Sequence, residues 1–294
     1  MKKASATGKI KALTLKKNNW SHHELLKLAV KAALHAGEQI LEIYNTDFAV
    51  ETKSDDTPVT IADKTSGQCI SKILEETQIP IISEEEDICE YSVRQHWSKV
   101  WIVDPLDGTK EYIKRNGEFA VNIALVENGK PVIGVIYAPV IHDIYFASTE
   151  LGSFKITQHD LIYELTKKNI SDNLFEFGKR LPLQKTPKTY TLVASRSHLS
   201  QDVNARIAQL KKIYGEVDII SVGSSIKQCW VAEGKAHEYP RYGLTMEWDT
   251  AAGQCILEMA GSELIDLSSN LPMQYNKANM RNNFFVARQK TSLL

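Results

Sequence analysis

The sequence has little of what secreted, membrane-spanning and nucleic-acid-binding proteins are built from. Its 294 residues include only four cysteines, which are far apart and form no CxxC pair. This argues against a disulfide framework or a zinc site and favours a reducing compartment. No apolar run approaches the ~20 residues that a membrane span requires, and the lysine-containing start has no apolar stretch of signal-peptide length. The net charge of −1 offers no basic field for nucleic acid.

These absences predict a cytoplasmic protein, with peripheral contact to the inner membrane surface as an alternative. The expected ligand is a small phosphate substrate rather than a nucleic acid polymer. The apolar fraction of 43% and the charged fraction of 24% are ordinary for a globular chain. Residues 1–20 are expected to form a disordered tail. The oligomeric state is left open between monomer and homodimer.

Hydrophobic periodicity gives residues 21–160 a helical start and a strand-rich continuation. Apolar residues recur at helical spacing over Ser21–Tyr44, and a second helix is expected over Asp63–Thr77. Strands follow on both sides of Asn128-Gly129, a dipeptide that is typical of a hairpin turn. We therefore expect an N-terminal α+β unit.

Residues 161–294 have a different rhythm, in which strands and helices alternate as in α/β proteins. The expected strands are Thr189–Ala194, Val217–Ser221 and His237–Arg241. The expected helices are Asp202–Tyr214, Ser224–Glu233 and Trp248–Met259. The boundary between the two units is placed within Lys155–Lys188, because this stretch is polar and irregular.

Two aspartates directly follow the apolar segment Val100–Val103, which is expected to be a short strand. Asp104 and Asp107 lie in the turn Asp104-Pro105-Leu106-Asp107-Gly108. Hard cations such as Mg²⁺ require oxygen ligands, so both carboxylates and the Leu106 carbonyl could converge on a metal ion. An ordinary Asp-rich turn is the alternative.

Two more acids lie at the ends of predicted elements. Glu84 follows the short strand Ile81–Ser83, and Asp249 lies at the start of the last predicted helix. The alternative for Asp249 is a helix N-cap, a role that does not prevent metal binding. Together with the double-acid turn, these positions predict a carboxylate metal site.

The segments Trp101–Thr109 (WIVDPLDGT) and Trp248–Gly253 (WDTAAG), with Ser83-Glu84-Glu85 upstream, resemble the signatures of the inositol monophosphatase superfamily. The likeness covers the chain from Ser21 to the C-terminus. It implies a lithium-sensitive, magnesium-dependent phosphatase of the α/β class. The implied fold is a layered αβαβα sandwich with the active site between two subdomains.

The resemblance also implies roles for individual residues. Two or three Mg²⁺ ions would be held by Glu84, Asp104, the Leu106 carbonyl, Asp107 and Asp249. The substrate phosphate would meet Glu84, Asp107, Gly108, Thr109 and Asp249. The catalytic pair that orients and deprotonates the attacking water would be Asp63 and Thr109. The alternative for Asp63 is a helix cap alone.

Three later segments most resemble the 3′(2′),5′-bisphosphate nucleotidases of the CysQ type, namely residues 193–198, 222–227 and 232–241. This implies hydrolysis of the 3′-phosphate of adenosine 3′,5′-bisphosphate. The implied nucleotide contacts are Ser195, His198, Gly223 and Lys227. Independently of the resemblance, the N–H groups of Gly223-Ser224-Ser225 begin a predicted helix and could hold an anion. The alternatives are a capped helix, a solvated lysine and a surface histidine.

Two rival functions remain open at this point. One is an inositol monophosphatase or another sugar phosphatase that uses the same metal site. The other is a non-catalytic regulatory binding protein with the same fold. Arg241 is either a further phosphate contact or part of a surface salt bridge.

Overall fold

Two large sheets organise the protein. The computed structural model describes residues 20–52, 58–157, 174–194 and 200–290. In spatial order, the first sheet consists of β3 (Ile81–Ser83), β4 (Lys99–Asp107), β5 (Ala120–Glu127), β6 (Lys130–Ala138), β7 (Asp143–Ser148), β8 (Gly152–Thr157) and β9 (Lys179–Arg180). The second sheet consists of β11 (Val217–Ser221), β10 (Tyr190–Ala194), β12 (Glu238–Arg241), β15 (Phe285–Gln289), β13 (Ser262–Asp266) and β14 (Leu271–Pro272). A separate ribbon pairs β1 (Val50–Thr52) with β2 (Pro58–Thr60).

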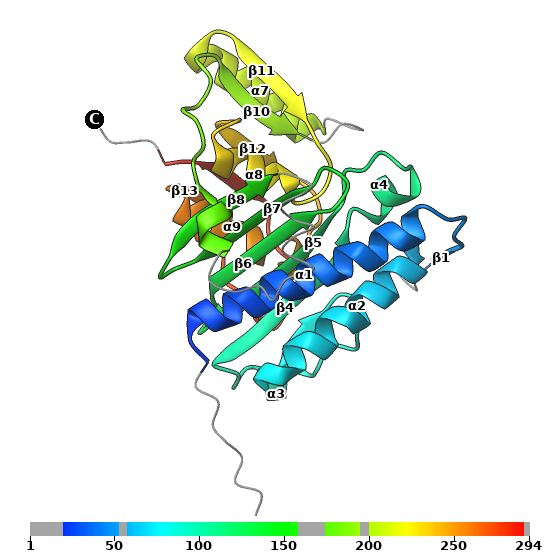
Figure 1. Ribbon diagram of the computed structural model, residues 1–294. Coiled ribbons are helices and arrows are strands. Elements are labelled where there is room, and N and C mark those ends of the chain that lie inside the picture. Colours follow the sequence, from blue (N-terminus) through cyan, green and yellow to red (C-terminus); the bar gives the residue numbers. More distant parts are fainter. Residues whose placement is uncertain (1–19, 53–57, 158–173, 195–199, 291–294) are drawn as a thin grey trace, which may run out of the picture.

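Helices cover both sheets. The α-helices are α1 (His22–Tyr44), α2 (Ile61–Leu74), α3 (Tyr91–Arg94), α4 (Thr109–Ile113), α6 (Leu174–Phe177), α7 (Gln201–Tyr214), α8 (Ile226–Glu233) and α9 (Ala251–Met259). Two 3₁₀ turns are η1 (Glu75–Thr77) and η2 (Glu247–Asp249). Helices α1 and α2 pack on the first sheet, α8 and α9 lie between the sheets, and α7 packs on the second sheet (Figure 1). These five layers confirm the predicted αβαβα sandwich.

The core is divided by the first sheet. Leu26 and Val30 of α1 pack with Trp101 and Ile123 on one side, and the other side packs against α8, α9 and the second sheet. Because both faces are covered, β5 is buried from Ala120 to Val126 and shows no alternation of apolar and polar residues. The structure also confirms the capping box that starts α1 and the hairpin turn at Asn128-Gly129, where both residues have positive φ.

The end of strand β4 differs from the prediction. The sequence suggested that the strand stops at Val103, but β4 continues to Asp107. Its pairing with β5 shifts between Asp104 and Asp107. Pro105 has no N–H to donate to a sheet, and an irregularity of this kind is where a strand tolerates proline. The aspartates therefore lie within a distorted strand rather than in a free turn.

Two helices begin later than predicted. Helix α9 begins at Ala251, because Glu247–Asp249 form a 3₁₀ turn. Helix α8 begins at Ile226, and Ser224 before it has a left-handed backbone with φ 58°. Both helix starts lie at the site described below. The non-helical residues before them therefore help to determine the geometry of the site.

The proposed domain limits fall mostly outside the described residues. This holds for the predicted tail and for the division between residues 160 and 161. Strand β9 comes from the second predicted unit but pairs with β8 of the first sheet. Among the described helices, none has the length and apolarity needed to cross a bilayer.

Candidate active site

Three aspartates from β4 and the η2 turn lie close together. Asp104 and Asp107 come from the distorted end of β4, and Asp249 ends the η2 turn that packs against β4. One carboxylate oxygen of each residue lies within 4.8 Å of the others. We call these three residues the carboxylate cluster.

Each member of the carboxylate cluster accepts a hydrogen bond that fixes its orientation. Asp104 accepts from the Leu106 N–H at 3.0 Å, and Asp249 accepts from the Met246 N–H at 2.7 Å. Asp249 therefore closes the 3₁₀ turn, and the alternative role as the N-cap of α9 is wrong, because that position is Thr250. Asp107 is held from a distance, since its donors belong to the loop before α8.

Burial and mutual repulsion act on the cluster. Asp104 is only 1% exposed, and burial, followed by the charges of Glu84, Asp107 and Asp249, raises its pKa well above the usual range. Burial also raises the pKa of Asp249 strongly, with Asp107 as the next cause. A divalent cation would remove this repulsion and keep the carboxylates ionised.

The oxygen donors around the cluster suit a hard cation. A cavity of about 200 Å³ is lined by Glu84, Asp104, Leu106, Asp107 and Asp249, among others. Glu84 follows β3, and its N–H donates to the Val103 carbonyl at 3.1 Å, which holds it beside β4. Glu84 lies in this cavity but outside the three-oxygen carboxylate cluster. An oxygen-only donor set of this kind fits Mg²⁺.

The structure brings Asp63 and Thr109 together beside the cluster. The Thr109 hydroxyl lies 3.1 Å from Asp63 Oδ1 and 3.3 Å from the Leu106 carbonyl. The other oxygen of Asp63 accepts from the N–H and the hydroxyl of Thr60, both at 2.7 Å. Asp63 is thus a helix cap and a partner of Thr109 at the same time. Burial raises its pKa, although the bonds from Thr60 oppose this.

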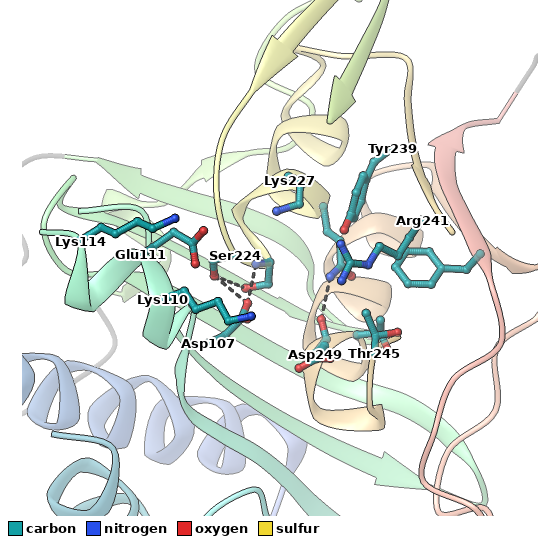
Figure 2. A pocket seen from close by; sticks show the side chains of 15 residues that line it. Asp107, Lys110, Glu111, Lys114, Ser224, Lys227, Tyr239, Arg241, Thr245 and Asp249 are labelled. Atoms are coloured by element: carbon teal, nitrogen blue, oxygen red, sulfur yellow. Dashed lines mark hydrogen bonds between the residues drawn. The ribbon is translucent and has the colours of Figure 1, made fainter. Parts of the chain in front are cut away.

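A larger cavity of about 480 Å³ adjoins the carboxylate cluster and shares Asp107, Gly108 and Asp249 with the smaller one. We call it the substrate cavity. Figure 2 shows Lys110 of α4 and Lys114, which directly follows α4, on one side of it. Tyr239 and Arg241 of β12 form the opposite side. The cavity therefore joins an acidic floor to walls that carry Lys110, Lys114 and Arg241 together with one acid, Glu111.

The helix start before α8 is not the open anion site that the sequence suggested. The Gly223 N–H donates to Glu118 Oε2 at 2.9 Å. The Ser225 N–H donates to Asp107 Oδ2 at 2.5 Å, and the Ser224 hydroxyl to the same oxygen at 2.6 Å. Asp107 of β4 and Glu118, which lies just before β5, therefore occupy the N–H groups of Ser225 and Gly223.

Lys227 lines the substrate cavity but is not a solvated lysine. It is 6% exposed, its ammonium donates to the Val222 carbonyl at 3.2 Å, and it lies 5.5 Å from the centre of the Tyr239 ring. Burial lowers its pKa to about 8. Arg241 donates to the Leu244 carbonyl at 3.1 Å. Ser195 and His198 lie outside the described residues.

Sequence reasoning missed several residues of the cavity wall, including Glu111. Lys110, Lys114 and Tyr239 were given no role, although all three line the substrate cavity. The signal for the lysines was present, because residues four apart lie on the same face of a helix. The turn at Gly108-Thr109 placed that helix next to the metal site. No comparable signal marked Tyr239.

Comparison with known proteins places the chain among phosphatases. The model of the inositol monophosphatase family matches residues 21–292. The 3′(2′),5′-bisphosphate nucleotidase CysQ of Salmonella typhimurium is 42% identical over 82% of this chain and 90% of its own. The CysQ of Escherichia coli K12 is 40% identical over 85% of this chain and 94% of its own.

Solved structures agree with this placement. The crystal structure of CysQ from Bacteroides thetaiotaomicron superimposes with a TM-score of 0.80 at 44% identity, covering 92% of this chain and 99% of that one. The IMPase of Thermotoga maritima superimposes with a TM-score of 0.68 at 19% identity, covering 90% and 92%. The second likeness shows the shared fold alone.

Proposed function

This chain belongs to the inositol monophosphatase family and is an enzyme of the phosphatase class, and we propose that it hydrolyses the 3′-phosphate of adenosine 3′,5′-bisphosphate to AMP and phosphate. The observation that carries the proposal is the carboxylate cluster beside the Asp63–Thr109 pair, at the mouth of a cavity with basic residues in its walls.

We propose Mg²⁺ as the cofactor, with two or three ions per site. The ligands would be Glu84, Asp104, the Leu106 carbonyl, Asp107 and Asp249, all of which line one cavity. When bound, the ions would neutralise phosphate charge and acidify water. The protein supplies the ordered oxygen donors, held by short hydrogen bonds from the backbone.

Asp63 and Thr109 would move the proton. A water beside Thr109 would donate to its hydroxyl oxygen, and the hydroxyl would pass its own proton to Asp63 Oδ1, which lies 3.1 Å away. Asp63 would thereby act as the general base of a two-step relay. Its raised pKa makes its carboxylate a better proton acceptor than an exposed aspartate. The bonds from Thr60 keep the carboxylate from rotating away.

The substrate cavity would select the nucleotide. The 3′-phosphate would lie where the two cavities meet. Both cavities are bordered by Asp107, Gly108 and Asp249, and the smaller one is also bordered by Thr109. The second phosphate would then meet Lys227, with Arg241 and Lys110 as further cations in the same cavity. We retain Ser195 and His198 as proposed nucleotide contacts. Gly223 would contribute only its shape, because its N–H is already bonded to Glu118.

The test is phosphate release with and without Mg²⁺. The substrates would be adenosine 3′,5′-bisphosphate, adenosine 3′-monophosphate and inositol 1-phosphate, compared by kcat/KM. The proposal expects the bisphosphate to be the best substrate. Faster hydrolysis of inositol 1-phosphate would assign the chain to the sugar phosphatases of its family. Tight binding of the bisphosphate without release of phosphate would assign it a regulatory role.

A further inference from the structure

Asp107 differs from the other two members of the carboxylate cluster in how it is held. Asp104 and Asp249 each accept a bond from a backbone N–H within three residues in the sequence. Asp107 Oδ2 instead accepts from the Ser224 hydroxyl and the Ser225 N–H, more than a hundred residues away in the sequence. These are charge-assisted bonds, which are stronger and more orienting than neutral ones.

The loop that carries these donors is itself fixed to the first sheet. The Ser225 hydroxyl donates to Asn122 Oδ1 at 2.7 Å, and Asn122 pairs with Asp104 in the ladder between β4 and β5. At the other end, a Cβ on Gly223 would lie 2.7 Å from the Glu118 carbonyl oxygen. The loop therefore has little freedom to shift relative to Asp107.

The backbone at Ser224 points to a role for its hydroxyl. Its φ of 58° is left-handed, a conformation that glycine adopts at no cost and serine does not. A non-glycine residue in this conformation is a reason to look for a function of its side chain. The hydroxyl has one, because it donates to Asp107 Oδ2 at 2.6 Å and lies 3.3 Å from the Ser225 hydroxyl.

We infer that Ser224 is a positioning residue for the metal ligand Asp107, through which the loop before α8 sets the affinity of the metal site. The inference rests on the proposed function only in requiring that Asp107 binds a cation. It goes further in that it links the metal site of the first sheet to the substrate cavity, since Ser224 and Lys227 belong to the same short segment.

The test separates metal affinity from folding. Ser224→Gly removes the hydroxyl, which lowers the stability of the fold, but it also removes the cost of a left-handed backbone at a non-glycine residue. The two effects on stability oppose each other. We expect its thermal unfolding midpoint in EDTA to stay within about 4 °C of the wild-type value. A calorimetric titration of the metal-free protein with Mg²⁺ alone should show affinity reduced about 10- to 100-fold, the usual cost of losing a group that orients a ligand.

Two further variants complete the test, one as a control and one as a second removal of the hydroxyl. Gln78→Gly changes a residue with nearly the same φ, 59°, at the end of η1, and should leave Mg²⁺ affinity unchanged. Ser224→Ala keeps the backbone restriction and removes only the hydroxyl, so its affinity should fall as in Ser224→Gly. Wild-type affinity in either Ser224 variant overturns the inference. It is also overturned if both variants unfold far below the wild type in EDTA, since Ser224 would then be structural.

The inference and the proposed function can fail separately. If the wild type releases phosphate with Mg²⁺ while Ser224→Gly binds Mg²⁺ normally, only the inference fails. If the wild type releases no phosphate from the bisphosphate, the proposed substrate fails, and the Mg²⁺ titration still decides the role of Ser224.

Discussion

The metal-binding side and the substrate side of the site are constructed in different ways. On the metal-binding side, Asp104 and Asp249 are oriented by their own neighbours in sequence. On the substrate side, α4 and β12 face each other from different layers and from distant parts of the chain (Figure 2). Asp107 lies between the two sides, because it belongs to β4 but is held by Ser224 and Ser225.

This difference shows which contacts fix the geometry of each side of the site. A carboxylate held by a bond two or three residues away keeps its geometry as long as its own turn is intact. A cavity between layers keeps its geometry only if the layers pack correctly. We therefore expect the largest effects from changes on the metal-binding side and smaller, substrate-dependent effects on the other side.

The largest effect should come from Asp104→Asn. Removing one charge of the proposed metal site should forfeit several kcal/mol of transition-state stabilisation, so kcat should fall by at least about 1000-fold at saturating Mg²⁺. The fold should persist, because the asparagine oxygen can still accept from the Leu106 N–H. Phosphate release measures the loss of kcat, and thermal unfolding measures whether the fold persists. Wild-type kcat would exclude Asp104 from the metal site.

The same variant should stabilise the metal-free protein. Burial and neighbouring charges raise the folded pKa of Asp104, so its contribution favours folding at low pH and is lost as pH rises through that pKa. At pH 7 in EDTA the unfolded chain ionises Asp104 more readily than the folded protein does, which costs stability, and asparagine removes this cost. A lower unfolding midpoint of Asp104→Asn at pH 7 would contradict the stated repulsion, and Asp202→Asn on exposed α7 is the control.

A smaller loss of turnover is expected from Thr109→Ala and from Asp63→Asn. Proton transfer by a positioned side chain contributes about 10²- to 10⁴-fold, so kcat should fall within that range while KM changes little. Thr109→Ser keeps a hydroxyl near Asp63 and should retain most of the activity. If instead KM rises and kcat is unchanged, the two residues bind substrate and do not move a proton.

How much the sequence could predict follows the same division. The acids of WIVDPLDGT and WDTAAG identified the carboxylate cluster, because strand ends and helix starts are local features. The five layers were expected from the resemblance to the inositol monophosphatase superfamily, and hydrophobic periodicity alone predicted the helix that became α1. The resemblance of both segments to one family joined them, although they are far apart in the chain.

The contacts between layers could not be predicted in this way. The N–H groups before α8 were expected to be free, yet Asp107 and Glu118 occupy those of Ser225 and Gly223. The alternative to a ligand contact for Lys227 was a position in solvent, yet the side chain is buried and bonded to Val222. Each outcome depends on which loop lies over which strand, and neither hydrophobic period nor local propensity contains that information.

The substrate side should respond selectively to Lys227→Met, which removes the charge but keeps a side chain packed on Tyr239. A charge-assisted hydrogen bond contributes about 1.5–3 kcal/mol, so kcat/KM for the bisphosphate should fall about 10- to 150-fold. Adenosine 3′-monophosphate should be almost unaffected, and Lys211→Met on exposed α7 should change neither substrate. Equal losses on both substrates would show that Lys227 does not bind the second phosphate.

The smallest effect should be a decline of kcat/KM with rising pH. We expect it in the wild type with the bisphosphate, and neither with the monophosphate nor in Lys227→Met. Burial lowers the pKa of Lys227 in the free enzyme to about 8, and kcat/KM reports groups of the free enzyme. The ammonium is therefore lost as pH rises through 8, and kcat/KM for the bisphosphate should decline by up to about tenfold per pH unit relative to the monophosphate. The stability of the fold should change in the opposite sense. The buried charge of Lys227 costs stability below pH 8, and this cost disappears as pH rises toward the pKa of lysine in the unfolded chain. In Lys227→Met the ratio of the two substrates should be constant from pH 7 to about 9.5. A ratio that still declines in this variant would place the titration on another group.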